Sequence, residues 1–360
     1  MKLKILLVRL RCVIFRFRDC PKRLLPIIWS RGWYQHSDWS GSSNYFYPAY
    51  PTRYRVSSLD NLIGKCGIIW VRLGSDPAKP ELDNGAAGDV VVFGNSIVER
   101  LSGPTVLVTT DGDRSVPSGI PGETANAILE NPNIVAWYTQ NLDGPNLHWK
   151  FRFLPIGIDL HTRVGGRLSG PHKKAQLFRS AICKSADSDN RKLRIWSDVH
   201  LEQDLGNMEK EFPNELGKPG ATLFQTRSEL RNGIESGMLD SVLDVAHCRL
   251  PLTQIWDKYG AYTFVMSLPG HGIDCHRTWE ALALGAIVIT VHSPIDELLQ
   301  PYKVVFLDRH DSEWWKEMTR KDWLPQAKNI GSQGKLLDLG YASNGLSDNL
   351  FIAKNTRNSD

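Results

Sequence analysis

The sequence of 360 residues has few cysteines, no long apolar run and only a small excess of charge. Its six cysteines include no C-x-x-C pair, so their spacing predicts neither a zinc site nor a dense disulfide framework. The net charge of +4 is smaller and less clustered than is typical of a nucleic-acid-binding protein. A chain this long can bury a large core without disulfides. Because domains usually have roughly 100–200 residues, the length predicts two domains.

The N-terminal residues 1–23 carry eight basic side chains and one acidic side chain, with apolar residues between them. No apolar run among them reaches the roughly 7–15 residues of a signal peptide or the about 20 of a spanning helix. Two interpretations stay open: a peripheral contact with an anionic membrane surface, and a first β-strand, which we favour. We therefore expect a cytoplasmic protein whose candidate membrane contact is residues 1–23.

Short apolar runs alternate with helical or polar stretches along most of the chain, which predicts an α/β fold with parallel sheets covered on both faces. We expect a first lobe over residues 1–165, a polar passage near 162–191, a second lobe over 190–325, and a polar tail or a return helix on the first lobe over 326–360. The predicted strands are 67–72, 89–93, 105–109, 134–138, 151–154, 193–196, 262–267, 286–291 and 303–307. The predicted helices are 96–101, 122–131, 225–233 and 252–258. Four tryptophans are expected in the core: Trp70, Trp137, Trp196 and Trp279.

The residues from Phe264 to Pro294 carry the most informative pattern. A strand over 262–267 leads into a Pro-Gly-His-Gly loop, and Asp274 then stands where a helix N-cap belongs. A helix of about ten residues follows, and Gly285 ends it at the usual left-handed position. With the apolar strand 286–291, these elements predict a compact βαβ unit.

The start of this helix predicts a phosphate site. Gly270 and Gly272 let backbone N–H groups approach a phosphate, and Arg277 in the first turn adds a guanidinium fork. Glu280, three residues on, shares a helix face with Arg277 and is placed to accept hydrogen bonds from ribose hydroxyls. The alternative is that Arg277 and Glu280 pair with each other on a solvated face. His271 either bonds the phosphate or sugar or is a solvated loop histidine.

The same stretch resembles the donor-binding segment of exostosin-like glycosyltransferases, whose pattern is F-x-x-S-P-x-G-x-G-x-D-x-x-R-x-x-E-A-L-x-x-G-x-x-P-I. The sequence departs from it where Leu268 precedes Pro269 and where Val288 replaces a proline. A weaker resemblance runs through residues 131–141 and 151–162, so that the likeness spans roughly residues 85 to 310. The matching residues are Phe264, Ser267, Gly270, Gly272, Asp274, Arg277, Glu280, Ala281, Leu282, Gly285 and Ile289.

The resemblance implies a GT-B arrangement, in which two Rossmann-like lobes face a cleft. The donor then lies on the C-terminal lobe and the acceptor, a glycan or a lipid-linked hydroxyl compound, on the N-terminal lobe. The implied enzyme is a hexosyl- or pentosyltransferase of glycan biosynthesis that needs no metal and no cofactor besides its nucleotide-sugar co-substrate. The donor sugar, the base, the acceptor and the anomeric outcome stay open.

Acidic residues at strand ends of the first lobe are further candidates. Asp111-Gly112-Asp113 is similar to the D-x-D metal motif of the other major glycosyltransferase fold, but Asp-Gly is also ordinary turn chemistry, and we favour a turn. Transfer with inversion needs a general base, for which Asp113 and Asp159 are candidates. The alternative is that each is a loop carboxylate without a catalytic role. On the helix predicted over 225–233, Arg227 and Arg231 share one face. They either reach the diphosphate or are ordinary surface charges, and we favour the second interpretation.

Two rival functions remain. Gly270-x-Gly272-x-x-Cys275 nearly satisfies the G-x-G-x-x-G/A pattern of NAD(P)-dependent oxidoreductases, and Asp296 lies near the acidic position that they require. The unit lies late in the chain, however, and Arg277 and Glu280 occupy a helix start that dehydrogenases usually leave apolar. The third hypothesis is a catalytically inactive, glycosyltransferase-like binding protein.

Overall fold

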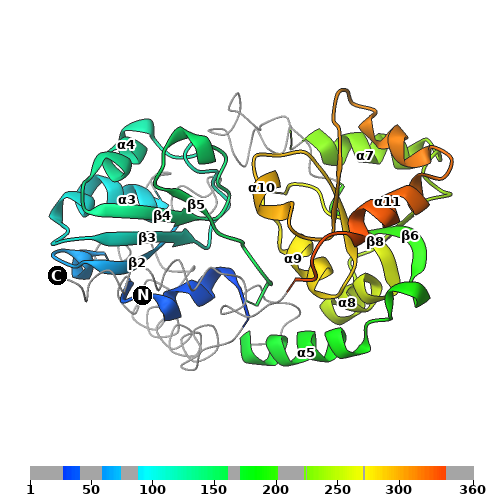
Figure 1. The fold of residues 1–360 in the computed structure, drawn as a ribbon, viewed down its shortest axis with the longest axis horizontal. Coiled ribbons are helices and arrows are strands. Elements are labelled where there is room, and N and C mark those ends of the chain that lie inside the picture. Colours follow the sequence, from blue (N-terminus) through cyan, green and yellow to red (C-terminus); the bar gives the residue numbers. More distant parts are fainter. Residues whose placement is uncertain are drawn as a thin grey trace, which may run out of the picture.

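The computed structural model describes residues 27–40, 59–73, 88–160, 171–201, 223, 225–270 and 272–337. The described chain forms two α/β lobes, each built on a parallel sheet of five strands, which lie side by side in Figure 1. The predicted fold class of two Rossmann-like lobes with parallel sheets is therefore confirmed. The alternatives for residues 1–23, strand or membrane contact, lie outside the described residues.

The first sheet has the strand order β1-β2-β3-β4-β5, and all its neighbours are parallel. Strands β2 and β3 are buried along their whole length, as continuous apolar runs predict. Trp70 and Trp137, both fully buried, confirm their expected core positions. The strands are β1 (Trp39–Ser40), β2 (Gly67–Arg72), β3 (Thr105–Thr110), β4 (Ile134–Thr139) and β5 (Phe151–Phe153). The helical segments of this lobe are η1 (Ser30–His36), η2 (Asp60–Leu62), α3 (Gly88–Ser96), η4 (Val98–Arg100), α4 (Gly122–Glu130) and η5 (Pro145–Leu147).

The strand predicted over 89–93 is wrong, because these residues lie in helix α3. Val90, Phe93 and Ile97 are buried at helical spacing. Gly94 lets α3 approach α4 closely, since a Cβ there would lie 2.5 Å from the Thr124 methyl group. A run of five apolar residues fits a strand and a buried helix equally well, so the packing partner decides.

The second sheet has the order β10-β9-β8-β6-β7, again with all neighbours parallel. Strand β7 and the short strand β1 of the first sheet were not predicted from the sequence. The strands are β6 (Lys192–Ser197), β7 (Leu243–Val245), β8 (Tyr262–Met266), β9 (Ile287–Val291) and β10 (Val304–Leu307). The helical segments are α5 (Pro171–Lys184), η6 (Ser188–Asn190), α7 (Thr226–Glu235), α8 (Leu252–Ala261), α9 (His276–Ala283), α10 (Asp296–Leu299), η8 (Trp314–Thr319) and α11 (Trp323–Ser332).

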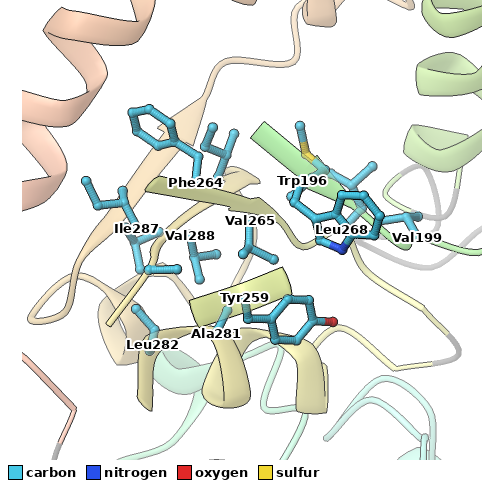
Figure 2. Packing of buried hydrophobic residues seen from close by; sticks show 14 of the residues in the cluster. Trp196, Val199, Tyr259, Phe264, Val265, Leu268, Ala281, Leu282, Ile287 and Val288 are labelled. Carbon is cyan, nitrogen blue, oxygen red and sulfur yellow. The ribbon is translucent and has the colours of Figure 1, made fainter. Parts of the chain in front are cut away.

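Helices cover both faces of the second sheet. On one face, Val265 and Val288 point toward Tyr259 of α8 and Ala281 of α9, as Figure 2 shows. On the other face, α11 packs against β9, where a Cβ on Gly331 would lie 2.3 Å from an Ile287 methyl group. The expectation that residues from 326 form a tail or pack on the first lobe is therefore wrong for the described part. Trp196 and Trp279 are buried, as expected.

The two lobes are joined by the segment that follows β5. Ile156, Ile158 and Leu160 belong to the core of the second lobe, although β5 belongs to the first sheet. Part of the predicted polar passage, residues 171–184, is helix α5, which packs on α8. Figure 1 places α9 on the side of the second lobe nearest the first. None of the helices in the described ranges combines the length and the apolar character needed to cross a bilayer.

Candidate functional site

The βαβ unit predicted around residues 262–291 forms with one change at the start of its helix. Strand β8 ends at Met266, helix α9 runs from His276 to Ala283, and Gly285 has a φ of 84°, which confirms its left-handed position. The N-cap, however, is Cys275 and not Asp274. The Asp274 side chain accepts hydrogen bonds from Ile156 of the linking segment and from Trp279 instead. His271 lies outside the described residues, so its predicted donor contact stays a prediction.

Arg277 pairs with a residue that sequence reasoning missed. Its Nε donates to Oδ1 of Asp198 over 2.7 Å, and its Nη2 donates to the Asp198 carbonyl over 3.3 Å. Asp198 directly follows β6 and also accepts a hydrogen bond from the Tyr259 hydroxyl. Burial by itself would lower the pKa of Arg277, but the attraction of Asp198 and its neighbours raises it above its ordinary value. Arg277 is therefore a fixed cation at the carboxyl edge of the second sheet.

A second guanidinium lies under the glycine loop. Arg227 of α7 is buried, and its Nε and Nη2 donate to the carbonyls of Pro269 and Leu268 over 2.7 and 3.3 Å. Burial, with a smaller effect of the neighbouring Arg277, lowers the pKa of Arg227 to about 10, so it remains charged at neutral pH. The interpretation of Arg227 as a surface charge is wrong. Arg231 is half-buried and donates to the Leu201 carbonyl.

Both glycines of the loop lie in close contact with a side chain. A Cβ on Gly270 would lie 2.7 Å from Nη2 of Arg227, and a Cβ on Gly272 would lie 2.8 Å from the amide atoms of Asn141. The Gly270 N–H donates to the Gly272 carbonyl over 2.9 Å and closes the turn. The loop thus lies between a side chain of its own lobe and a side chain of the first lobe.

Two carboxylates bind the linking segment of the first lobe to α9. Asp274 accepts the N–H of Ile156 over 2.8 Å and the Trp279 indole N–H over 2.7 Å. Glu280 accepts the N–H of Asp159 over 3.1 Å and the Trp256 indole N–H over 3.0 Å. The predicted alternative of an Arg277–Glu280 pair on a solvated face is wrong, because Glu280 is only 4% exposed and bonds elsewhere.

A histidine adds a third connection between α9 and this segment. Nδ1 of His276 lies 2.7 Å from the Gly157 carbonyl oxygen. Gly157 has a φ of 68°, and a Cβ there would lie 2.3 Å from the Ile28 carbonyl oxygen, so only glycine fits. Residues 156–159 are therefore held at three points, by Asp274 and by His276 and Glu280 of α9.

Burial shifts the pKa values of both carboxyl groups upward. Desolvation raises the pKa of Asp274 from 3.8 to about 6, against the lowering effect of its hydrogen bonds with Ile156 and Trp279. Desolvation, together with the negative charge of Asp159, raises the pKa of Glu280 from 4.5 to about 7. Both groups therefore exchange protons near neutral pH at the junction of the lobes.

The acidic candidates of the first lobe differ in their surroundings. The Asp111 carboxylate accepts Nε–H of Arg31 over 2.9 Å and Nε–H of Arg72 over 2.7 Å. Asp113 and Asp159 are half-buried, and their catalytic roles stay predictions. Within the described ranges, no three side chains of histidine, cysteine, aspartate or glutamate gather as a metal site would require.

Sequence reasoning missed Asp198, Asn141 and Trp256. Asp198 and Asn141 follow the apolar strands β6 and β4 within two residues, at the carboxyl edges where ligands bind in parallel sheets. Both also lie within three residues of the ends of the strands predicted over 193–196 and 134–138, which is the signal that could have found them. Trp256 had no such signal, because its indole N–H meets Glu280 only through the packing of α8 on α9.

No protein-family model and no curated protein sequence matches the chain. A solved structure described as trehalose-6-phosphate from E. coli bound with UDP-2-fluoro glucose is similar in part. It has 12% sequence identity and a TM-score of 0.34, over 79% of this chain and 74% of the other. At this score the likeness carries no inference about the site.

The raised carboxyl pKa values predict that stability falls as pH rises. Because the folded-state pKa values of Asp274 and Glu280 lie above the unfolded values, the folded state binds their protons more tightly. Their stabilisation is complete below about pH 4 and is lost as pH rises through 6 and 7. Each tenfold difference in proton affinity between the folded and unfolded states corresponds to about 1.4 kcal/mol. We expect the free energy of unfolding in urea to be lower at pH 8 than at pH 5 by a few kcal/mol.

The variant Glu280→Gln should flatten this dependence, since it removes one titrating group. Glu229→Gln is the matched control, because Glu229 is another buried carboxylate of the same lobe and bonds to Arg309 and Trp314. This variant should keep the slope of the parent protein. An equal slope in Glu280→Gln and the parent would show that the junction carboxyls do not cause it.

Proposed function

We propose that the chain is a glycosyltransferase that moves a sugar from a nucleotide-sugar donor to a hydroxyl acceptor in a GT-B arrangement. The observation that carries the proposal is the position of Arg277, a partly exposed guanidinium held by Asp198 beside the glycine loop and the N-terminus of α9. Helix N-termini and guanidinium forks favour phosphate oxygens. The resemblance of residues 264–289 to exostosin-like glycosyltransferases supports the same ligand.

The proposed chemistry follows from the charge of the leaving group. The bond between the anomeric carbon and the phosphate oxygen breaks, and the nucleoside diphosphate leaves with the electron pair. Negative charge grows on the diphosphate, where Arg277 and the loop N–H groups stabilise it. Because Asp198 already holds Arg277 in place, little reorganisation is needed when the charge develops.

The other donor and acceptor contacts are part of the proposal. Gly270, His271 and Gly272 form the loop at the phosphates. Glu280 is the proposed ribose contact, although it is 4% exposed and both of its oxygens already accept hydrogen bonds within the protein. Asp113 or Asp159 takes the proton of the acceptor hydroxyl as it attacks. The acceptor is a glycan or a lipid-linked compound. For residues 1–23, contact with an anionic membrane stays the alternative to the strand that we favour.

The oxidoreductase alternative gains no support from the geometry. Asp296, which would have to bind a ribose of NAD, accepts the N–H of Ser293 over 2.8 Å at the start of α10. The first turn of α9 carries Arg277, which Asp198 holds from the end of β6, whereas dehydrogenases usually leave this helix start apolar.

The Arg277→Ala variant tests the proposal. Removing this cation should lower donor turnover by about a hundredfold or more, the usual effect of losing a group that stabilises developing charge. Turnover is measured as the release of UDP from UDP-glucose or of GDP from GDP-mannose, after thermal-shift screening of UDP, GDP and NAD. A nucleotide at 100 times its dissociation constant should stabilise the parent by about 2.7 kcal/mol.

The control is Arg309→Ala, which breaks a similar ion pair of the same lobe, Arg309 with Glu229 at 2.5 Å. This variant should lose stability but keep its turnover. Equal turnover in the parent and Arg277→Ala would place the donor elsewhere. Stabilisation by NAD alone would support the oxidoreductase, and nucleotide binding without transfer would support an inactive binding protein.

We further expect donor turnover to persist in EDTA. The Asp111 carboxylate, the first acid of the D-x-D sequence, already accepts hydrogen bonds from Arg31 and Arg72, whose positive charges disfavour a metal ion at this carboxylate. The measurement is turnover after chelation and after addition of Mn²⁺. Activity lost in EDTA and restored by Mn²⁺ would contradict metal independence and direct attention to Asp113.

A further inference from the structure

Asn141 of the first lobe has an unusual backbone conformation and contacts the second lobe. It follows β4 by two residues, is 1% exposed and has a φ of 53°. Left-handed backbone is costly for most residues and least so for glycine and asparagine. The Asn141 carbonyl also accepts the N–H of Val116 over 2.9 Å, so the residue is fixed within its own lobe.

The orientation of its side-chain amide is set by the first lobe. Nδ2 of Asn141 donates to the Gly112 carbonyl over 3.1 Å, which leaves Oδ1 toward the second lobe. There Oδ1 accepts the N–H of Asp274 over 2.9 Å, across 133 residues of sequence. One amide group therefore connects the turn after β3 with the residue that precedes the N-cap of α9.

The same amide lies against the glycine loop. The nearest atoms to a Cβ on Gly272 would be Nδ2 and Oδ1 of Asn141, each at 2.8 Å, and then Cγ at 3.1 Å. The Gly272 carbonyl in turn accepts the Gly270 N–H that closes the loop. Asn141 thus limits both the position of the loop backbone and the residue type at 272.

We propose that Asn141 is a positioning residue of the donor site, which holds the glycine loop and the start of α9 in their phosphate-binding arrangement while the two lobes are docked. The identity of the ligand rests on the proposed function, but the positioning itself does not. The donor site is then built from both lobes, although Arg277 and the glycine loop belong to the second lobe alone.

Hydrogen exchange tests the positioning without any ligand. Asn141→Gly removes the amide and keeps a residue that adopts positive φ without strain, so the fold should persist. We expect exchange at the Asp274 amide to accelerate by at least about tenfold, the scale of one lost hydrogen bond. The control is Asn133→Ala, which removes a hydrogen bond from Asn133 Nδ2 to the Leu101 carbonyl within the first lobe. It should leave exchange at residues 272–276 unchanged.

A steric rescue tests the contact with Gly272. Gly272→Ala places a methyl group against the Asn141 amide and should weaken binding of UDP or GDP by about tenfold or more, the scale of overpacking a close contact. Asn141→Gly alone should also weaken binding. In the double variant Asn141→Gly/Gly272→Ala the methyl group has room, so the combined loss should be smaller than the product of the two single losses.

The outcomes separate the two proposals. Unchanged exchange at Asp274 in Asn141→Gly, or single losses that multiply in the double variant, would overturn the positioning role. A parent protein that binds neither UDP nor GDP would overturn the proposed function. In that case the exchange measurement still decides the role of Asn141.

Discussion

The structure of the junction depends on hydrogen bonds between buried carboxylates and backbone N–H groups. Asp274 and Glu280, both on or next to α9, accept the N–H groups of Ile156 and Asp159 from the segment that leaves the first sheet. An unpaired buried N–H or carboxylate costs far more than a pair gains, so these contacts fix the docking of the segment. The helix that carries Arg277 is thereby tied to the segment that links the two lobes.

This arrangement separates the roles of residues that stand close together in the sequence. Asp274, His276 and Glu280 face the linking segment, whereas Arg277 turns to Asp198 at the end of β6. A cation near the glycine loop and the contacts that anchor the helix are therefore supplied by residues 274–280 at the start of α9. The raised pKa values of Asp274 and Glu280 follow from the same burial that makes the anchor firm.

The sequence predicts those parts of the fold that depend on local pattern. Strand β2 has the predicted bounds because six consecutive residues are buried, and Gly285 has the predicted left-handed φ. Helix α3 was predicted as a strand, because its apolar run is too short to show a period. The anchoring role of Asp274 and Glu280 had no local signal, since their N–H partners lie 118 and 121 residues earlier. Arg227 was misjudged for the same reason, because only the fold places the Leu268 and Pro269 carbonyls beside it.

A crystal structure of the protein with UDP tests the central claim most directly. The account predicts that the diphosphate oxygens accept hydrogen bonds from the Arg277 guanidinium and from N–H groups of the loop before α9. It also predicts that Asp274 and Glu280 still accept the N–H groups of Ile156 and Asp159. A diphosphate bound away from Arg277, or a nucleotide that fits only after these two carboxylates release the linking segment, would contradict the account.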